Sequence, residues 1–323
     1  MATANEHQSE RDTIESLHRD NIFNFFRSHT AYDVLPESGK VVLLDASMSA
    51  FGAFHVMAAN EQTAVPVWDG RSDRYMGMLT VSDLLEMLLF CTSSENNFKD
   101  SLRSIDLAYW LSNSERPSGC PESSVEVKPD DDLLCVLRTL LRNDCRVLPV
   151  LEREGNTPLL NQCIIGQITY LLLFRFLYYH QEQDLGTLKG TLREAGIGTM
   201  EASKVIKVHP NEPVKDVLKL MSENGISGVP VVDANGKFMD MFSDADILGL
   251  TELDLNVPVE HALQRAENGE SKPKHCLITD PLSKVISCFS IARTTRLACL
   301  DEKGSLQGVV TLVDLFKFLA GMS

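Results

Sequence analysis

The fold of this chain is decided by residues 229–246, which read Val229-Pro230-Val231-Val232-Asp233 and, after a turn at Ala234-Asn235-Gly236, Asp240-Met241-Phe242-Ser243-Asp244-Ala245-Asp246. An apolar strand with Pro-Val leads through a turn to a second apolar strand, a hydroxyl residue and an Asp that opens a helix. The pattern recurs at Val65–Asp83 and Leu297–Asp314, while Leu148–Leu172 keeps the strands and the hydroxyl but ends in Leu. Asp83, Asp246 and Asp314 follow Pro66, Pro230 and the cognate Ala298 by 17, 16 and 16 residues. Four internal repeats therefore organise the chain.

Each repeat is predicted to run helix, strand, strand, helix, an α/β (α+β) arrangement. The first helices follow the cap-like segments Asp45–Ser49, Pro129–Asp132, Pro210–Pro213 and Asp280–Ser283. In the third, Val214, Val217, Leu218 and Met221 share one helix face. One repeat buries too little apolar surface to stand alone, so we expect two pairs packed sheet against sheet. The expected boundaries are a tail at 1–25 and repeats at 26–112, 113–185, 186–257 and 258–323, with 182–189 as the linker between pairs.

Composition narrows the class of protein. The 323 residues are 44% hydrophobic with a formal net charge of −15, which fits globular domains and argues against nucleic-acid binding. We find no apolar run of 18 residues and no signal peptide, so we expect no membrane span and a cytoplasmic protein, with the nucleus as the alternative compartment. The eight cysteines show no C-x-x-C spacing, and Cys135, Cys145, Cys163, Cys288 and Cys299 are interpreted as buried apolar residues.

Two features of the sequence, its histidines and an acidic run, are considered as a metal site, but neither supports one. The eight histidines are too scattered for a ligand set, and no metal is assigned. Asp130-Asp131-Asp132 precedes an apolar-periodic stretch, and carboxylates at a helix start stabilise its dipole and cap its amides. We therefore interpret the acidic run as a helix cap.

The repeated Asp has two interpretations. A carboxylate at a helix start can simply cap it, and Thr80, Ser243 and Thr311 stand three residues earlier each time. The same carboxylate can accept both hydroxyls of a ribose, while the hydroxyl residue and helix amides favour a phosphate. The residues alone leave capping and ribose binding open.

The repeats resemble the cystathionine-beta-synthase (CBS) domain, which is normally used in pairs known as Bateman modules. Nearly the whole chain, from about Phe26 to Leu319, is similar to the gamma-subunit family of AMP-activated protein kinase. The likeness is carried by Ser28–Pro36, by Val65–Asp69 with Gly77–Thr80, and by Ile197–Thr199. This family keeps the ribose-binding Asp in repeats one, three and four and loses it in two, as this chain does.

The resemblance implies a flat, pseudo-symmetric disc of four CBS repeats in two Bateman pairs, with adenine nucleotides (AMP, ADP or ATP) bound near its centre. It implies that Asp83, Asp246 and Asp314 hold riboses. Thr80, Ser82, Thr199, Ser243 and Thr311 would offer hydroxyls, and Arg146 and Arg296 would meet phosphates. For both arginines a surface or salt-bridge role is the alternative.

The chain also departs from the family. Basic residues of the family are replaced by Thr63, Gly225 and Thr295, and Leu171-Leu172 replaces a Lys-Arg pair. Arg146 stands in a shifted slot, and Arg293 lies near the changed position of repeat four. We therefore expect weakened phosphate binding, with less preference among nucleotides.

Two functions remain open at this stage. The first is a non-catalytic regulatory subunit that senses energy state in a heterotrimer with a kinase catalytic alpha subunit and a scaffolding beta subunit. The alternative is a gamma-like assembly scaffold that has largely stopped sensing nucleotide. No P-loop, G-x-S-x-G or kinase signature supports an enzyme.

Overall fold

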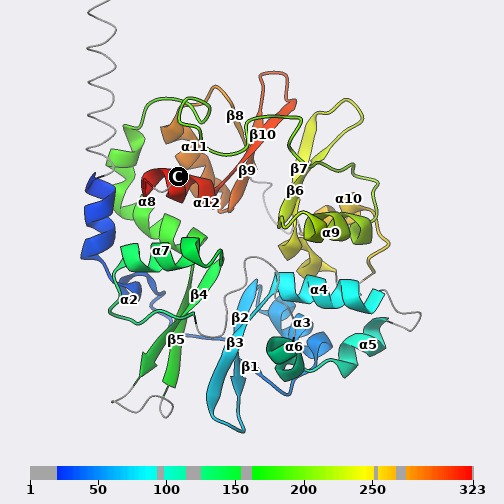
Figure 1. Ribbon diagram of the computed structural model, residues 1–323. Helices are drawn as coiled ribbons and strands as arrows, with labels where there is room; N and C mark the ends of the chain where they lie inside the picture. The colour runs from blue at the N-terminus through cyan, green and yellow to red at the C-terminus, as the bar shows by residue number, and fades with distance from the viewer. Residues whose placement is uncertain are drawn as a thin grey trace, which may run out of the picture.

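The computed structural model describes residues 20–92, 98–113, 125–153, 162–250, 254–266 and 274–321. Its elements form four repeats arranged around a common centre (Figure 1). Each repeat contains a first helix, an antiparallel strand pair and a following helix, as the sequence predicts. The elements in that order are α3 (Ala50–Ala59), β2 (Ala64–Asp69), β3 (Arg74–Thr80) and α4 (Val81–Thr92); α7 (Leu133–Arg142), β4 (Val147–Arg153), β5 (Gln162–Thr169) and α8 (Tyr170–Gly186); α9 (Val214–Glu223), β6 (Gly228–Val232), β7 (Phe238–Ser243) and the 3-10 helix η1 (Asp244–Gly249); α11 (Leu282–Ala292), β9 (Arg296–Leu300), β10 (Leu306–Thr311) and α12 (Leu312–Leu319).

Each antiparallel strand pair has a further, parallel partner that precedes it in the sequence. The short strands β1 (Leu44–Asp45) and β8 (His275–Leu277) pair in parallel with β2 and β9. In the other two repeats this partner is reduced to single bridges, Val127 to Val150 and Val208 to Val231. The four sheets thus repeat one topology. Further helices are α2 (Ala31–Val34), α5 (Phe98–Ser104), α6 (Leu107–Asn113) and α10 (Val259–Ala266), and residues 20–28 are also helical.

All four predicted first helices are present, and two of them, α3 and α7, begin with a side-chain cap; α9 and α11 begin after Pro213 and Pro281 without one. The Asp132 carboxylate accepts a hydrogen bond from the Cys135 amide at 2.7 Å, so the acidic run does end in a cap. Ser49 Oγ likewise accepts from the Gly52 amide. On α9, the four predicted apolar residues are fully buried.

The apolar cores connect the repeats into a closed ring. Strands of repeats one and two share one small core around Met78 and Leu151, and strands of repeats three and four share another around Met241 and Ala298. Two larger cores lie between the pairs: one joins the helices of repeats one and three, and the other joins those of repeats two and four. Sheets therefore pack within each pair and helices pack between pairs, which leaves the four helix starts facing the centre (Figure 1).

Two local predictions are wrong. The segment 182–189 is not a linker throughout, because α8 continues to Gly186 across a kink at Gln181 and Leu185 is buried in the core. Cys135 and Cys163 are exposed and Cys288 is only half-buried, since these apolar segments also have outward faces; Cys145 and Cys299 are buried as predicted.

Some expectations cannot be placed. The expected tail at 1–25 lies outside the described residues as far as residue 19, and the expected boundary near residue 113 adjoins the segment 114–124, which also lies outside them. Among the described helices, none combines the length and apolar character needed to cross a bilayer.

Candidate functional site: a cavity at the centre of the four repeats

A cavity of about 630 Å³ lies where the four repeats meet. Each repeat contributes the end of its second strand and the start of its following helix, at residues 80–82, 169–171, 243–245 and 311–314. Repeats two and four add Arg146 and Arg296 from their first strands or the residue before them. The volume is in the range of small-molecule sites in proteins.

Most of the residues predicted for nucleotide binding line this cavity, and two do not. Those on its wall are Thr80, Ser82, Arg146, Thr199, Ser243, Arg296, Thr311 and Asp314. Asp83 and Asp246 are not among the lining residues. The three equivalent carboxylates are therefore placed in different surroundings.

All three carboxylates cap their helices in the same way. Oδ2 of Asp83 accepts from Thr80 N and Oγ1, each at 2.8 Å. Oδ2 of Asp314 accepts from Thr311 N at 2.9 Å and Oγ1 at 2.7 Å. Asp246 does the same with Ser243, at 2.6 and 2.8 Å. Capping thus uses one carboxylate oxygen, and the position of the second oxygen decides whether a ligand can reach it.

The second oxygen of Asp83 faces the protein interior. Asp83 has no exposed surface, and its Oδ1 lies 3.4 Å from Nε1 of Trp110, which donates from α6. Asp83 remains a predicted ribose ligand, but in this conformation a ligand would have to move Trp110 to reach it.

Asp246 is partly exposed but, unlike Asp314, it does not line the cavity. Burial raises the pKa of Asp246 above its ordinary value, against the hydrogen bonds from Ser243 and the nearby Lys274, which lower it. Lys274 itself forms an ion pair with Asp240 at 3.1 Å. Burial thus disfavours the charged form of the Asp246 carboxyl.

Asp314 is the carboxylate that meets the cavity. Asp314 is partly exposed and lines the cavity wall. Within the described part of the chain, its Oδ2 accepts hydrogen bonds from Thr311 and its Oδ1 accepts none. Thr199 also lines the cavity, and a bridge between Thr199 and Val309 holds it against β10. Asp314 therefore has an oxygen available to a ligand.

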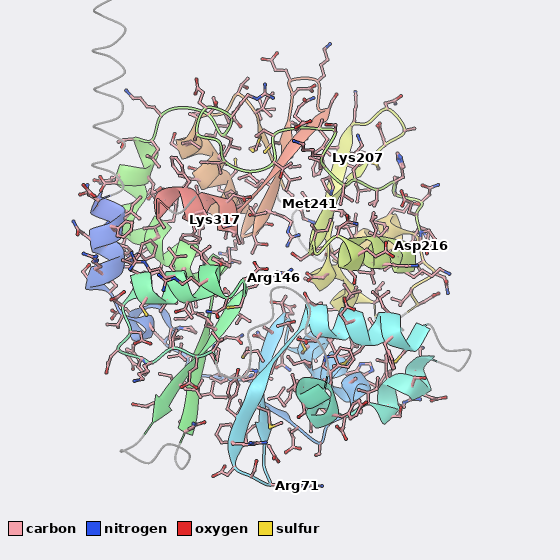
Figure 2. All side chains as sticks on the ribbon, viewed as in Figure 1. Arg71, Arg146, Lys207, Asp216, Met241 and Lys317 are labelled. Carbon is pink, nitrogen blue, oxygen red and sulfur yellow. The ribbon has the colours of Figure 1, made fainter. Side chains whose placement is uncertain are left out.

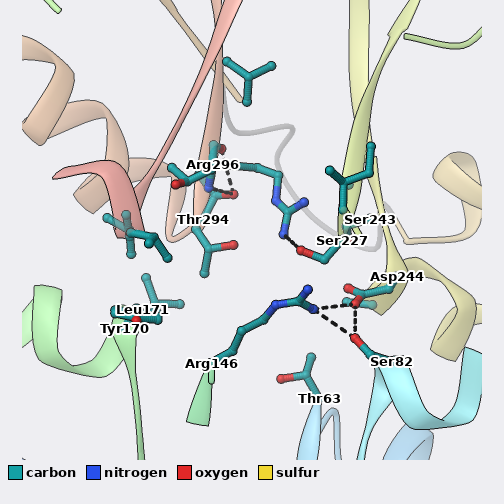
Figure 3. A pocket seen from close by; sticks show the side chains of 18 of the residues that line it. Thr63, Ser82, Arg146, Tyr170, Leu171, Ser227, Ser243, Asp244, Thr294 and Arg296 are labelled. Atoms are coloured by element: carbon teal, nitrogen blue, oxygen red, sulfur yellow. Dashed lines mark hydrogen bonds and ion pairs between the residues drawn. The ribbon is translucent and has the colours of Figure 1, made fainter. Parts of the chain in front are cut away.

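The two arginines approach the centre from opposite sides (Figure 3). Nη1 of Arg146 donates to Ser82 Oγ at 2.9 Å and to Asp244 Oδ2 at 3.1 Å. Nη2 of Arg296 donates to Ser227 Oγ at 2.6 Å. Burial lowers the pKa of Arg296, and the charge of Arg146 adds to that effect while Asp244 opposes it. Figure 2 places Arg146 at the middle of the disc, whereas Arg71 lies at its rim.

The departures from the family fall on the cavity wall. Thr63, Leu171, Gly225 and Thr295 all line it, together with Arg293. Positions expected to hold cations thus line the cavity, but most of them are neutral. Leu172, the residue that replaces the Asp of repeat two, lines a separate cavity of about 490 Å³.

Sequence reasoning missed three residues of the centre. Asp244 and Ser227 bind the two arginines, and Gly228 makes room for Arg296 because a Cβ there would overlap its guanidinium. One signal was available for Asp244, since the equivalent residues of the other repeats are the apolar Val81, Tyr170 and Leu312.

This arrangement of paired strand–strand–helix units matches one known family. The family model described as "CBS domain" matches residues 32–89, 197–252 and 270–321. These matches cover just over half of the chain, so the chain belongs to the CBS-domain family.

Within that family, the chain is similar to gamma subunits of 5'-AMP-activated protein kinase. It is 30% identical to that of Dictyostelium discoideum over 310 residues, which are 92% of this chain and 52% of the relative. It is 26% identical to that of Saccharomyces cerevisiae over 326 residues, 99% of this chain and 98% of the relative. The chain thus spans about half the length of the first relative and nearly all of the second. The resemblance seen in the sequence is confirmed.

A solved structure has a similar overall fold. A Methanocaldococcus jannaschii protein, titled as a proposed archaeal homologue of g-AMPK, matches with a TM-score of 0.69 at 18% identity. The match covers 90% of this chain and all of that one. At this identity the likeness supports the overall fold alone.

Proposed function

We propose that this chain is a non-catalytic regulatory subunit of an AMP-activated-type protein kinase, and that it binds an adenine nucleotide in the central cavity. The partners would be a catalytic alpha and a scaffolding beta subunit. The similarity to gamma subunits over more than 90% of the chain supports this assignment. The observation that carries the binding proposal is the carboxylate of Asp314 on the wall of a cavity that also contains Arg146 and Arg296.

In the proposed complex Asp314 holds the ribose through the oxygen not used in capping. Thr311 and Thr199 would offer hydroxyls beside it, and Arg296, which pairs with Thr311 on the neighbouring strand, would meet the first phosphate. Ser82 and Thr80 line the far wall, and Ser243 lies near Asp244. Asp83 and Asp246 keep a place in the proposal as secondary sites that need local rearrangement.

The test is calorimetric titration of AMP into the purified chain and into its complex with partner subunits. Replacing Asp314 by Asn removes a charged acceptor, and a hydrogen bond to a charged group contributes about 1.5–3 kcal/mol. AMP affinity should therefore fall about 10- to 100-fold.

Asp33→Asn is the matched control. Asp33 forms the same capping box, accepting from Thr30 N at 2.7 Å and Thr30 Oγ1 at 2.9 Å, but it does not line the cavity. Equal AMP affinity of the two variants would remove Asp314 from the site. Absence of binding at millimolar AMP, ADP and ATP would refute the binding proposal itself.

The alternative is an assembly scaffold with little nucleotide sensing, and the neutral Thr63, Gly225 and Thr295 on the cavity wall favour it. The two functions separate in a reconstituted kinase complex. A sensor loses the AMP dependence of kinase activity in Asp314→Asn, whereas a scaffold assembles normally and is indifferent to both the nucleotide and the substitution.

A further inference from the structure

The centre of the cavity contains an acidic residue where the repeats otherwise have apolar ones. The residue that follows the repeated Thr or Ser is Val81 in repeat one, Tyr170 in repeat two and Leu312 in repeat four, and each is at most 5% exposed. In repeat three it is Asp244, which is 9% exposed. Burying a carboxylate costs free energy unless polar groups compensate it. The polar groups that bind the Asp244 carboxylate therefore indicate the role of this side chain.

The carboxylate of Asp244 is held by residues of two other repeats. Its Oδ2 accepts from Ser82 Oγ of repeat one at 2.9 Å and from Arg146 Nη1 of repeat two at 3.1 Å. Ser82 also accepts from Arg146 at 2.9 Å, which closes a triangle of hydrogen bonds (Figure 3). The triangle lies on the cavity wall, and the Arg146 side chain remains 37% exposed.

Arg296 of repeat four faces the same space. Its guanidinium is fixed by Ser227 at 2.6 Å and lies against Gly228. Its charge interacts with both Asp244 and Arg146, which act on its pKa in opposite directions. Two guanidinium groups thus line the same cavity, one of them bonded to Asp244, and a pair of guanidinium groups is also the arrangement that binds phosphate.

We infer that Asp244 is an internal anion that holds Arg146 in the place of a ligand phosphate, and that it makes the central cavity select against ligands with several phosphate groups. The inference rests on the proposed function, since it specifies which nucleotides the cavity accepts. A monophosphate can meet Arg296 and leave the triangle intact. A longer polyphosphate extends toward Arg146, where it must displace Asp244 and then lie beside its charge.

The test compares wild type, Asp244→Asn and Asp240→Asn as full-length chains. Asp240 belongs to the same repeat and pairs with Lys274, outside the cavity lining, so its replacement changes net charge equally. Calorimetry measures AMP, ATP and tripolyphosphate. Asp244→Asn should bind ATP and tripolyphosphate about tenfold more tightly, while AMP affinity changes less than about threefold. Asp240→Asn should match wild type.

The outcomes separate this inference from the proposed function. An unchanged ATP-to-AMP affinity ratio in Asp244→Asn, with AMP still binding, overturns the inference and leaves nucleotide binding intact. If no nucleotide binds either protein but Asp244→Asn gains tripolyphosphate binding, the inference holds and the proposed function fails. No gain for tripolyphosphate overturns the inference in every case. Should thermal unfolding show that Asp244→Asn is not folded, Asp244→Ser takes its place with the same criteria.

Discussion

Gly228 offers a sharp test of how the central cations are held. It begins β6 without a positive φ, so an Ala is acceptable to the backbone there. A Cβ would nevertheless overlap Nη1 of Arg296, and would lie 2.8 Å from its Cζ and 3.0 Å from the carbonyl oxygen of Phe242. Because the carbonyl belongs to a paired strand, the guanidinium is the group that must move, and it would lose its bond to Ser227.

The expected cost follows from that lost bond. A hydrogen bond from a charged group contributes about 1.5–3 kcal/mol, so Gly228→Ala should lower the free energy of unfolding by roughly that amount. If Arg296 meets a phosphate, AMP affinity should also fall about tenfold. Urea unfolding and calorimetry measure the two effects. Gly249→Ala is the control, since its Cβ would have no neighbour within 4 Å.

A double-mutant cycle isolates the cause. In an Arg296→Met background, which lacks the guanidinium, Gly228→Ala should cost much less than in wild type. An equal cost in both backgrounds would show that the strand, not the arginine, rejects the methyl group, and the reasoning about Arg296 would then be wrong.

Three further predictions concern the stability of the fold. Asp132→Ala should lower the free energy of unfolding by about 1 kcal/mol, because it removes the cap on the Cys135 amide; urea unfolding checks this. Hydrogen bonds from the Ser305 and Lys303 amides lower the pKa of Asp301, so its contribution to stability is present above about pH 4 and is lost as the pH falls through the folded-state pKa. The difference in Tm between wild type and Asp301→Asn should accordingly narrow below that pH, and a constant difference would contradict the assignment. Gly308→Ala should destabilise by about 1–3 kcal/mol, since a Cβ would overlap the Thr199 carbonyl oxygen in the bridge to Val309; an unchanged Tm would contradict this.

The parts of the fold that could be predicted are those fixed by neighbours in the sequence. The strand pairs and the caps at Ser49 and Asp132 depend on residues a few positions apart, and the structure contains them as expected. The exposed Cys135 and Cys163 were missed because an apolar segment does not reveal which of its faces meets the core. The helix through Gly186 was missed because Leu185 packs in a core that other segments complete.

The centre of the cavity could be predicted only in part. Arg146 and Arg296 were singled out because the resemblance to the gamma-subunit family implies phosphate-binding cations at or near these positions. Their partners Asp244 and Ser227 belong to a different repeat from either arginine, so the contacts depend on how the ring closes. A comparison of equivalent positions among the repeats would have singled out Asp244 as the polar exception, though not its partners.

The unequal surroundings of the repeated Asp bear on what its retention means. Repeat two has Leu172 in that position, yet α8 still starts there, with Thr169 Oγ1 accepting from the Leu172 amide at 3.2 Å. The helix start therefore does not require the carboxylate, and its loss costs only a capping contribution of about 1 kcal/mol. An Asp that only caps and an Asp that also binds ligand would be equally compatible with the sequence. Asp83 and Asp314 differ in the surroundings of the second carboxylate oxygen. In Asp83 this oxygen accepts a hydrogen bond from Trp110, whereas Asp314 lines the cavity. We therefore expect the proposed nucleotide binding to be asymmetric, with repeat four providing the accessible acid and repeat one keeping its acid for the helix.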